Sequence, residues 1–516
     1  MKISSSRRGF LRGMAGVSMA GVGGCKMFGC SSGKIRLAAV GIMGKGLTDW
    51  LPMVRSGKAE LVAWCDADAQ QRTAALTHKL VKAVPGLVDK LARIPFYTDY
   101  RRLNDNIGIL GIQAMTISTP DHAHAAIAIG AMKQGVHVYV QKPLVRTLWE
   151  LDYFGKTAKE YGVITQMGNQ GSALDSMRRC VEVVQSGIIG EATEVHVWTN
   201  RPVWPQGLSA KKASQGPADA IPNGLDWNSW LGVAKYRNYK GAYKPGEKGY
   251  DPWNLCKNVY HAFSWRGFYD FGAGAFGDMA CHTMNMPFRG LELGIVKSAE
   301  CIKVEEHNDV TYPTKSIVKM VYAERESKCR PGVKLPECKL FWYDGDLKPE
   351  AALMPKVVAT LGKVPNTGCY FVGTKGSVVM IDDYGGKCMM ALNDDKKMVD
   401  MFDHEAAKAV EQSIPRRSDA ANKIEKGAGA AAVSADGHYV EFLEAIRGEG
   451  AYYEQVHSRC FADTEHSVPI MEGILVGCIA QRLPGKKLTW NSCRQSFDQA
   501  EANAFVKPYI RDGFAF

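Results

Sequence analysis

Short apolar runs alternate with amphipathic stretches through the first third of the chain. Residues 35–40 form an apolar run that predicts a strand, and the apolar positions between residues 47 and 54 recur at the spacing of a helix. Strands that alternate with helices in this way are typical of a doubly wound parallel sheet with helices on both faces. Further strands of this sheet are expected over residues 59–65, 109–117, 136–140 and 163–167.

The pattern changes after about residue 170, where strands and helices no longer alternate regularly. We expect an α+β domain here, with an open and largely antiparallel sheet. Residues 413–436 are rich in Ala, Gly and charge and predict an exposed connector. The expected strands of this part lie over residues 193–198, 316–322 and 376–380, and the expected helices over 439–447 and 466–482.

A length of 516 residues suits two domains better than one. The pattern places an α/β domain over residues 33–170 and a larger substrate and oligomerisation domain over 171–516. Hydrophobic residues at 46%, charged residues at 23% and a mean hydropathy of −0.19 are those of an ordinary soluble globular protein. These values exclude a disordered chain, a collagen and a polytopic membrane protein.

Residues 1–32 have the composition of an export signal. A twin-arginine motif stands at residues 6–12, and the weakly apolar stretch over 14–24 is too short to span a bilayer as a helix. The alternative is a chance basic start to a cytosolic protein. Small residues before Cys25 resemble a lipobox, although Cys30 competes with it and small residues are common at cleavage sites. We expect recognition by the twin-arginine export machinery and a periplasmic or exported protein, with a lipid anchor as an open alternative.

The net charge of +11 adds little about partners. Five of these positive charges lie within the first 30 residues, which hold no acidic residue, and the rest of the chain carries +6. Nucleic-acid-binding proteins cluster Lys and Arg with aromatic residues between them, whereas the basic runs here are pairs such as Lys211-Lys212 and Arg416-Arg417. We expect no nucleic-acid partner.

Fourteen cysteines form no metal or redox motif, because Cys-x-x-Cys does not occur in the sequence. Cys329 and Cys338 could close a loop by a disulfide in an oxidising compartment, and free thiols are the alternative. His122 and His124 could be taken as a metal pair. A starting helix would not aim both at one side, however, and no third ligand is indicated, so we expect no metal.

The first strand runs into a glycine-rich turn that leads into a helix. Gly41, Gly44 and Gly46 allow backbone N–H groups and a helix N-terminus to approach a pyrophosphate. Met43 stands where the Gly-x-Gly-x-x-Gly fingerprint has its middle glycine, so the pyrophosphate site is either altered or compensated by Gly44. Asp66 ends the second strand, where an acidic side chain accepts hydrogen bonds from the adenosine ribose. The turn predicts a dinucleotide site that favours NAD over NADP, with an ordinary βα turn as the alternative.

Two further strands of the expected sheet end in polar residues. One runs into residues 118–124 (Ser-Thr-Pro-Asp-His-Ala-His) and the next into 141–144 (Gln-Lys-Pro-Leu). The carboxyl ends of strands in a doubly wound sheet face the ligand crevice, so these tips are expected to line one site.

The Thr-Pro-Asp-His-Ala-His segment at 119–124, the helix after it and the strand that ends in Lys142-Pro143 together resemble the Gfo/Idh/MocA family of NAD(P)-dependent sugar and cyclitol oxidoreductases. The resemblance covers essentially the whole chain after the export signal. It implies a Rossmann-type domain followed by an α+β domain. Three further segments are similar to the branch of this family that carries twin-arginine signals, namely residues 165–171, 265–282 and 482–503.

The resemblance implies roles for individual residues. Family members usually have Glu-Lys-Pro where this chain has Gln-Lys-Pro at 141–143, and Lys142 is the first catalytic candidate because the family lysine lies near the nicotinamide and the substrate. The family's Asp-x-x-x-His matches Asp278 and His282. Ser172 stands where this branch commonly has a histidine, so a substrate contact is altered or missing. The implied cofactor-binding residues are Thr119, Pro120, His124, Gln141 and Lys142, and the implied substrate-binding residues are Asn169, Gln170, Trp265 and Arg266.

Physical chemistry supports the same catalytic residues. Asp278 and His282 share one face of a helix, where a carboxylate can orient an imidazole, and a solvated surface pair is the alternative. Hydride transfer from a secondary alcohol needs a base for the hydroxyl proton, and histidine titrates near neutrality. Lys142 either has a depressed pKa when buried or stays charged and polarises the forming carbonyl. We expect His282 to act as general base or acid and Lys142 as its electrostatic partner.

Six of the eleven tryptophans lie within residues 198–265. Indole rings pack against the C–H faces of sugars, so this region predicts a carbohydrate platform, with plain core packing as an equal alternative. Residues 202–249 are rich in Pro and Gly and predict a long loop of the kind that tends to be functional.

Three functional hypotheses follow. The first is an exported NAD-dependent oxidoreductase that acts on a secondary alcohol of a sugar or cyclitol by hydride transfer. The second is a glycoside hydrolase that uses NAD to oxidise a sugar hydroxyl transiently, eliminate the aglycone, add water and reduce again. The third is a cofactor-bearing sugar-binding protein whose chemistry has decayed, motivated by Met43, Gln141 and Ser172. We also expect tightly bound NAD, because a periplasm offers no pool of the free cofactor, and a homo-oligomer.

Overall fold

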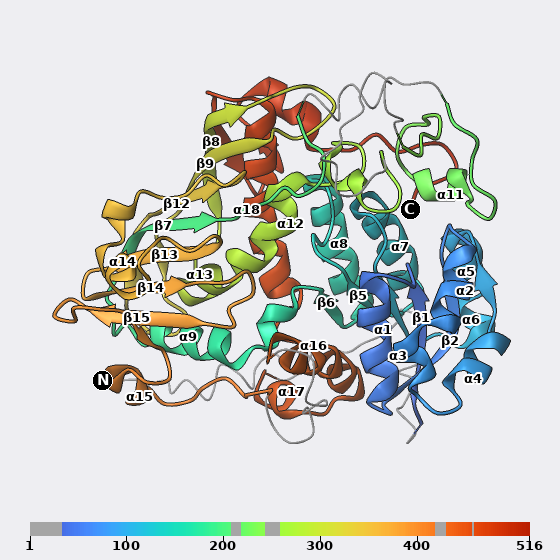
Figure 1. Cartoon of the computed structure of the whole chain (residues 1–516), viewed down its shortest axis with the longest axis horizontal. Coiled ribbons are helices and arrows are strands. Elements are labelled where there is room, and N and C mark those ends of the chain that lie inside the picture. The colour runs from blue at the N-terminus through green and yellow to red at the C-terminus, as the bar shows by residue number, and fades with distance from the viewer. Residues whose placement is uncertain (1–32, 208–217, 243–258, 418–429, 457–458) are drawn as a thin grey trace, which may run out of the picture. The chain divides into compact units, whose positions relative to one another are not determined.

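Six parallel strands form the first sheet of the computed structural model (Figure 1). Their order, β3-β2-β1-β4-β5-β6, is that of a doubly wound nucleotide-binding fold, as the alternation of strands and helices predicts. The structure describes residues 33–207, 218–242, 259–417, 430–456 and 459–516. The six strands are β1 (Ile35–Val40), β2 (Ala59–Cys65), β3 (Phe96–Tyr97), β4 (Ala114–Ile117), β5 (His137–Val140) and β6 (Thr165–Met167).

Helices cover both faces of this sheet because its strands are apolar on both sides. Leu37 and Ala39 of β1 share a core cluster with Trp50 of α1 (Lys45–Arg55). Val40 belongs to the cluster on the other face, with residues of α7 (Asp121–Met132) and α8 (Leu148–Tyr161). The remaining helices of this part are α2 (Gln70–Thr77), α3 (Lys79–Lys82), α4 (Leu87–Arg93), α5 (Tyr100–Asp105) and α6 (Ile107–Leu110).

The strand expected over residues 109–117 is wrong in its first half. Helix α6 occupies its start, and the strand begins only at Ala114. Gly111 ends the helix in a left-handed conformation with φ +59°. Ile109 is 85% exposed on α6, so the apolar run that predicted the strand includes one side chain that is not buried.

The second sheet has ten strands in the order β16-β15-β14-β13-β7-β12-β9-β8-β17-β18. β7 and β12 pair in parallel and the other neighbours pair antiparallel, which confirms the predicted fold class. Its strands are β7 (Ala192–Trp198), β8 (Val296–Glu305), β9 (Lys315–Tyr322), β12 (Cys338–Tyr343), β13 (Gly368–Gly373), β14 (Gly376–Met380), β15 (Cys388–Leu392), β16 (Val399–Asp400), β17 (Lys487–Asn491) and β18 (Ser496–Phe497), and a separate small pair is β10 (Arg325–Glu326) with β11 (Lys334–Leu335).

Helix α18 (Thr464–Arg482) joins the two sheets. It packs on β8 and β9 of the second sheet and also on α8 and β6 of the first, as Figure 1 shows. It also packs on α12 (Gly274–Thr283), so a helix next to the pocket described below rests on the element between the sheets. The other short elements are η1 (Gln170–Ala173), α9 (Asp175–Gln185), α11 (Trp227–Leu231), η2 (Ser264–Gly267), α13 (Asn285–Gly290), η3 (Ala351–Leu353), α14 (Pro355–Leu361), α15 (Glu405–Lys408), α17 (Ala451–Val456) and η5 (Ala500–Phe505).

The exposed connector expected over residues 413–436 is wrong in part, although Ser413 at its start is exposed. Ile414 and Arg417 are buried, and α16 (Ala430–Arg447) begins within the expected connector. The cause is a pair of ionic contacts, because the Arg417 guanidinium lies 3.1 Å from Glu444 and 3.9 Å from Glu441 on that helix. Charge in this segment therefore marks a buried ion pair.

The end of the chain returns to the first sheet. Tyr439 and Phe442 of α16 join the core cluster that contains Trp50. Phe514 is buried, with the guanidinium groups of Arg101 and Arg511 over its ring. Parts of the expected second domain thus complete the packing of the first.

Several expectations concern residues that the structure does not describe. The twin-arginine motif at 6–12, the cysteines Cys25 and Cys30, and Trp253 all lie outside the described residues. Cys329 and Cys338 are both free thiols, so the proposed loop disulfide is not formed. No helix among the described residues is long and apolar enough to cross a membrane.

Candidate active site

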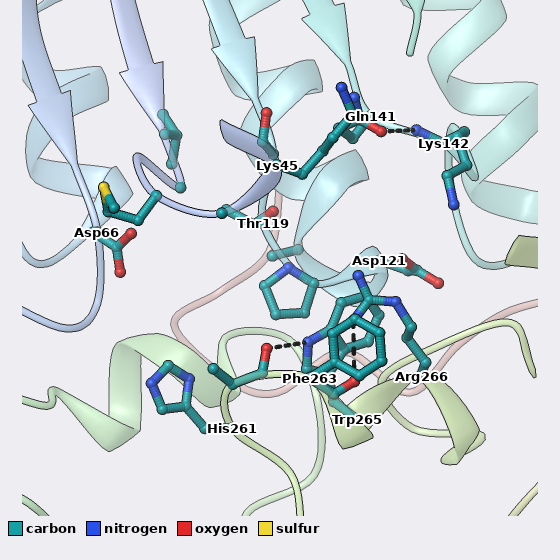
Figure 2. Close-up of a pocket in the computed structure, with 18 of the residues that line it drawn as sticks. Lys45, Asp66, Thr119, Asp121, Gln141, Lys142, His261, Phe263, Trp265 and Arg266 are labelled. Atoms are coloured by element: carbon teal, nitrogen blue, oxygen red, sulfur yellow. Dashed lines mark hydrogen bonds between the residues drawn. The ribbon is translucent and has the colours of Figure 1, made fainter. Parts of the chain in front are cut away.

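A pocket of about 610 Å³ lies between the carboxyl ends of the parallel strands and loops from the later part of the chain. Asp66 at the end of β2 and Lys142 after β5 stand at opposite sides of it, with Thr119 between them (Figure 2). The pocket therefore spans the point where the strand order reverses between β1 and β4, where open α/β sheets bind their ligands.

The glycine-rich turn after β1 lines this pocket. A Cβ at Gly46 would lie 1.7 Å from the carbonyl oxygen of Gly41, so glycine lets α1 begin directly behind the strand. Gly44, the N-cap of α1, has φ +59° and no atom within 4 Å of a Cβ position, so its backbone is open to a ligand. Met43 is accommodated because its backbone does not adopt a positive φ.

Asp66 occupies the far end of the pocket with Gln71 and Tyr100. One carboxylate oxygen accepts a hydrogen bond from the backbone N–H of Ile42 at 3.0 Å, and the other accepts one from the N–H of Asp68 at 3.1 Å. Burial raises the pKa of Asp66 to about 6. The carboxylate thus ties the glycine-rich turn to β2 and faces the place where the adenosine ribose of a dinucleotide is expected.

Lys142 and Asp278 form an ion pair at the opposite end. The Lys142 ammonium lies 2.9 Å from the Asp278 carboxylate and 3.1 Å from the Asp278 carbonyl oxygen, and Arg266 approaches the same carboxylate at 3.4 Å. Burial alone would raise the pKa of Asp278, but the two cations outweigh it and the net pKa is lowered. Asp278 is therefore ionised and holds the lysine in place.

His282 lies one turn after Asp278 on α12 and lines the same pocket. Burial, and then the positive charge of Lys142, hold the pKa of His282 well below its usual range, so the imidazole is neutral. The ring packs edge-on against Tyr384 at 4.7 Å, and Nδ1 has no hydrogen-bond partner among the described residues. The expected contact between Asp278 and the imidazole is not made, because the carboxylate binds the stronger cations Lys142 and Arg266 instead.

A second carboxyl, Asp121 at the start of α7, also lines this end. One of its oxygens accepts a hydrogen bond from the N–H of Ala273, the residue before α12, at 3.1 Å. Burial, and then the charge of Asp278, raise the pKa of Asp121 to about 8. It therefore carries a proton at neutral pH, unlike the Asp278 carboxylate.

Aromatic residues from the later loops form one wall of the pocket. Trp204, Trp230 and Trp265 line it together with Phe263. The Arg266 guanidinium lies 4.0 Å above the ring of Phe263 and 4.3 Å above that of Trp265 (Figure 2). Two other tryptophans of the predicted platform do not line the pocket. Trp198 lies in a separate core cluster, and Trp227 stacks on Trp230 with the two rings 4.6 Å apart, behind the pocket lining.

Three of the predicted site residues do not line the pocket, namely Gly46, His124 and Asn169. Both ring nitrogens of His124 are within hydrogen-bond distance of backbone carbonyls, those of Pro143 and Thr119, so it fixes the strand tips from behind. His122 contacts the carbonyl oxygen of Trp230, and the described residues contain no group of three His, Cys, Asp or Glu that could hold a metal. Ser172 is buried and accepts a hydrogen bond from Asn285.

Some residues that line the pocket were not predicted from the sequence as site residues. Lys45 follows the glycine turn and Asp121 stands within a quoted motif, so their positions alone could have suggested them. Arg201 and Tyr384 come from loops of the second sheet. Arg201 stands directly before the long loop that was expected to be functional, whereas nothing local marks Tyr384. Tyr384 is fixed because Asp382 accepts hydrogen bonds from four successive backbone N–H groups of residues 384–387.

Comparison with known proteins matches residues 35–169 to a family model described as an oxidoreductase family with an NAD-binding Rossmann fold. The match shows that residues 35–169 are similar to the nucleotide-binding domain of the Gfo/Idh/MocA family. The matched residues contain the glycine turn, Asp66, Asp121 and Lys142. With a glycine turn open at Gly44 and a carboxylate at the end of β2, they have the features that an NAD molecule requires.

Two curated relatives match only in part. The 2,7-anhydro-N-acetylneuraminate hydratase of Mediterraneibacter gnavus is 27% identical over 85 residues, 16% of this chain and 23% of that protein. Glycosyl hydrolase family 109 protein 2 of Akkermansia muciniphila is 28% identical over 166 residues, 31% of this chain and 32% of that protein. The matches span about a third or less of the length of these relatives.

Solved structures show the same fold over most of the chain. An inositol dehydrogenase homolog of Azotobacter vinelandii, solved with NADH and myo-inositol, has a TM-score of 0.54 at 14% identity and covers 89% of this chain and 98% of that one. The WlbA dehydrogenase of Bordetella pertussis, solved with NADH and UDP-GlcNAcA, has a TM-score of 0.52 at 14% identity over 89% and 99%. At such identities the likeness concerns the fold alone.

Proposed function

We propose that the protein binds NAD and transfers hydride at a secondary alcohol carbon of a carbohydrate or cyclitol. The proposal rests on one observation. A single pocket extends from Asp66 and the glycine turn at one end to Lys142, Asp278 and His282 at the other. Structures of the same fold bind NADH together with myo-inositol or UDP-GlcNAcA, which supports a polyhydroxylated substrate.

Residues of the domain that matches the family model would hold the cofactor. The glycine turn at Gly41 and Gly44 would accept the pyrophosphate and Asp66 the adenosine ribose. Thr119 and Lys142 would border the nicotinamide half. We propose NAD rather than NADP, because Asp66 would repel a phosphate on the ribose, and we propose that it stays tightly bound.

The substrate end combines apolar and polar groups. Indole and phenyl rings of Trp204, Trp265 and Phe263 would face the C–H surfaces of a sugar. Gln170 and Arg201 would bind its hydroxyl groups from the other elements of the wall. This mixture of a few placed polar groups with aromatic surface is that of a carbohydrate site.

The proposed catalytic residues have different charges and therefore different roles. Bound NAD supplies the hydride acceptor. His282 is neutral, so it can take the proton of the reacting hydroxyl. Lys142, held by the Asp278 carboxylate, would place its positive charge beside the oxygen that becomes a carbonyl. Reduction in the opposite direction would return the proton from the same imidazole.

A redox-neutral glycosidase is the second candidate, and Asp121 favours it. Elimination of an aglycone requires a group that donates a proton to the leaving oxygen, besides the base that removes the acidified C–H proton. Asp121 carries a proton at neutral pH and lies in the same pocket as His282. The two curated relatives are named a hydratase and a glycosyl hydrolase, and both names describe reactions without net oxidation.

One experiment separates the candidates. The protein is purified, denatured and analysed for released NAD(H), and the native protein is assayed on aryl glycosides and on free sugars or cyclitols with and without added NAD. Oxidation that consumes added NAD is expected for the first candidate, and glycoside cleavage that needs no added cofactor for the second. Protein that neither holds nor binds NAD would contradict both.

The same assays test the base. His282→Ala is expected to lower turnover by about 10³-fold while the cofactor is retained. His196→Ala is the control, because His196 is also buried but contacts Tyr343 and Glu194 on the second sheet, and its turnover should stay within about twofold of the wild type. Full activity of His282→Ala would remove the residue from the mechanism.

A further inference from the structure

A fully buried carboxylate, Asp49 on α1, lies directly behind the pocket wall. One of its oxygens accepts hydrogen bonds from the Lys45 ammonium at 2.6 Å and the Tyr439 hydroxyl at 3.0 Å. The other accepts one from the Ser118 hydroxyl at 2.7 Å. The Gln141 amide donates toward both oxygens, at 3.0 and 2.9 Å. Lys45, Ser118 and Gln141 all line the pocket, so three parts of its wall converge on this one carboxylate.

The network fixes two cations of the pocket. Asp49 holds Lys45 directly by an ion pair. It acts on Lys142 indirectly, through Gln141, because the Gln141 side-chain oxygen accepts a hydrogen bond from the Lys142 backbone N–H at 3.2 Å. Figure 2 shows Lys45 and Lys142 on either side of Gln141. Burial lowers the pKa of His282, and the positive charges of Lys142 and Lys45 lower it further, so both cations act on the proposed base.

Asp49 also explains why glutamine stands at position 141. A glutamate there would place a second carboxylate about 3 Å from Asp49, where like charges cannot both ionise without a large penalty. Gly168 keeps the side chain in this place, since a Cβ at Gly168 would lie 2.6 Å from the Gln141 amide nitrogen. The negative charge that the Glu-Lys-Pro pattern would bring after β5 is therefore carried in this chain by α1.

We propose that Asp49 is a positioning residue for the catalytic end of the pocket, acting on Lys45 directly and on Lys142 through the Gln141 amide. The inference rests on the proposed function of this pocket as a site for NAD and hydride transfer. It predicts that the network requires one carboxylate and one amide at positions 49 and 141, and that the two can exchange places.

Helix α16 is part of the same hydrogen-bond network around Asp49. Its Tyr439 hydroxyl contacts both the Asp49 carboxylate and the Lys45 ammonium, at 3.0 and 2.8 Å. Tyr439 is buried against Tyr139 of β5, with the two rings 5.5 Å apart. A helix from late in the chain thus completes the support of a residue in the first helix.

A charge exchange tests the proposal. Gln141→Glu is expected to lower kcat/KM by about 100-fold and to shorten the retention of NAD, because two carboxylates then face one another. The double variant Asp49→Asn with Gln141→Glu restores one carboxylate and one amide and is expected to recover kcat/KM to within about fivefold of the wild type. Retention is measured as NAD per polypeptide after purification and as the half-time of its release.

Gln481→Glu provides the matched control. The Gln481 amide donates to the buried carboxylate of Asp344 at 3.2 Å, and neither residue lines the pocket. At pH 8, above the pKa of about 7 to which burial raises Asp344, this substitution places two carboxylates side by side away from the pocket. It should lower the unfolding temperature while the retention of NAD and kcat/KM stay within about twofold of the wild type. A pocket effect equal to that of Gln141→Glu would make the Asp49 network a matter of stability alone and overturn the proposal.

If the Gln141→Glu variant does not fold, Tyr439→Phe tests the proposal instead. It removes one hydrogen bond to Asp49 and should lower kcat by about fivefold with KM nearly unchanged. If the wild-type protein holds NAD, an unchanged kcat in Tyr439→Phe would overturn this proposal but not the proposed function. A double variant as impaired as Gln141→Glu would do the same. A wild-type protein that neither holds NAD nor turns over would overturn the proposed function and this inference with it.

Discussion

At the scale of single residues, the pocket contains two neighbouring carboxyls whose pKa values move in opposite directions. Lys142 and Arg266 lower the pKa of Asp278 against the effect of burial, whereas burial and then Asp278 raise the pKa of Asp121 to about 8. Pairs separated in this way are the arrangement that lets one carboxyl accept and the other donate a proton. Their partners decide the difference, because both side chains are buried.

Asp121→Asn should alter the pH dependence of stability. The unfolded chain loses this proton near its ordinary pKa of 3.8, while the folded chain keeps it until about pH 8. The folded state therefore binds more protons in this window, and its stability falls as pH rises, by up to about 1.4 kcal/mol per pH unit. The variant should lack this contribution, so its free energy of unfolding should fall less between pH 5 and pH 8. Urea unfolding at several pH values measures the difference.

Asp344→Asn is the control for this prediction. Burial raises the pKa of Asp344 to about 7, but the residue does not line the pocket. Both variants should change the slope of stability against pH, whereas only Asp121→Asn should remove an inflection near pH 8 from the profile of kcat/KM. A wild-type slope in the Asp121 variant would show that this carboxyl is ionised in the folded protein.

At the scale of elements, the apolar pattern located β1 and β2 with the bounds that the structure has. Strands buried on both faces are continuous apolar runs, so their limits are visible in the sequence. The pattern failed where a left-handed Gly111 separates α6 from β4, and where ionic contacts bury residues near Arg417. Those features depend on backbone conformation and on distant partners.

Helix α8 offers a clean test of local control, because it begins with a capping box. The Thr147 hydroxyl accepts a hydrogen bond from the backbone N–H of Glu150, whose carboxylate accepts one from the N–H of Thr147. Thr147→Ala should lower the free energy of unfolding by about 1 kcal/mol, measured by urea unfolding. Thr147→Ser keeps the hydroxyl and should retain most of the stability. Equal losses in both variants would show that the methyl group, and not the cap, matters.

At the scale of the whole molecule, the pocket is shared between segments far apart in the sequence. Lys142 and Asp278 meet across 136 residues, and α18 supports both sheets. Phe514 packs against Arg101 of α5, and helix α16 packs against the first sheet. We propose that a protein assembled in this way takes up NAD before export, since twin-arginine transport carries folded proteins.

Export itself is a prediction from residues outside the described structure. Replacing Arg7 and Arg8 together by Lys should leave the precursor in the cytoplasm, because the pair is the part of the signal that the export machinery recognises. Fractionation and immunoblotting measure the distribution. Arg12→Lys is the matched control and should be exported. Unchanged export of the double variant would contradict the twin-arginine assignment.

Lys142 and His282 were named as site residues from the resemblance to a family. The sequence pattern by itself determined the doubly wound sheet, the glycine turn and the polar strand ends at Asp66 and residues 141–144. These features follow from local spacing, because the period of a strand or helix decides which side chains lie together. Tertiary structure alone decided that Asp278 binds Lys142 and not His282, and that Tyr384 and Arg201 line the site. It alone brought Asp49 to Gln141, 92 residues away. A side chain's partner across such distances depends on how elements pack, and no pattern within one element encodes it.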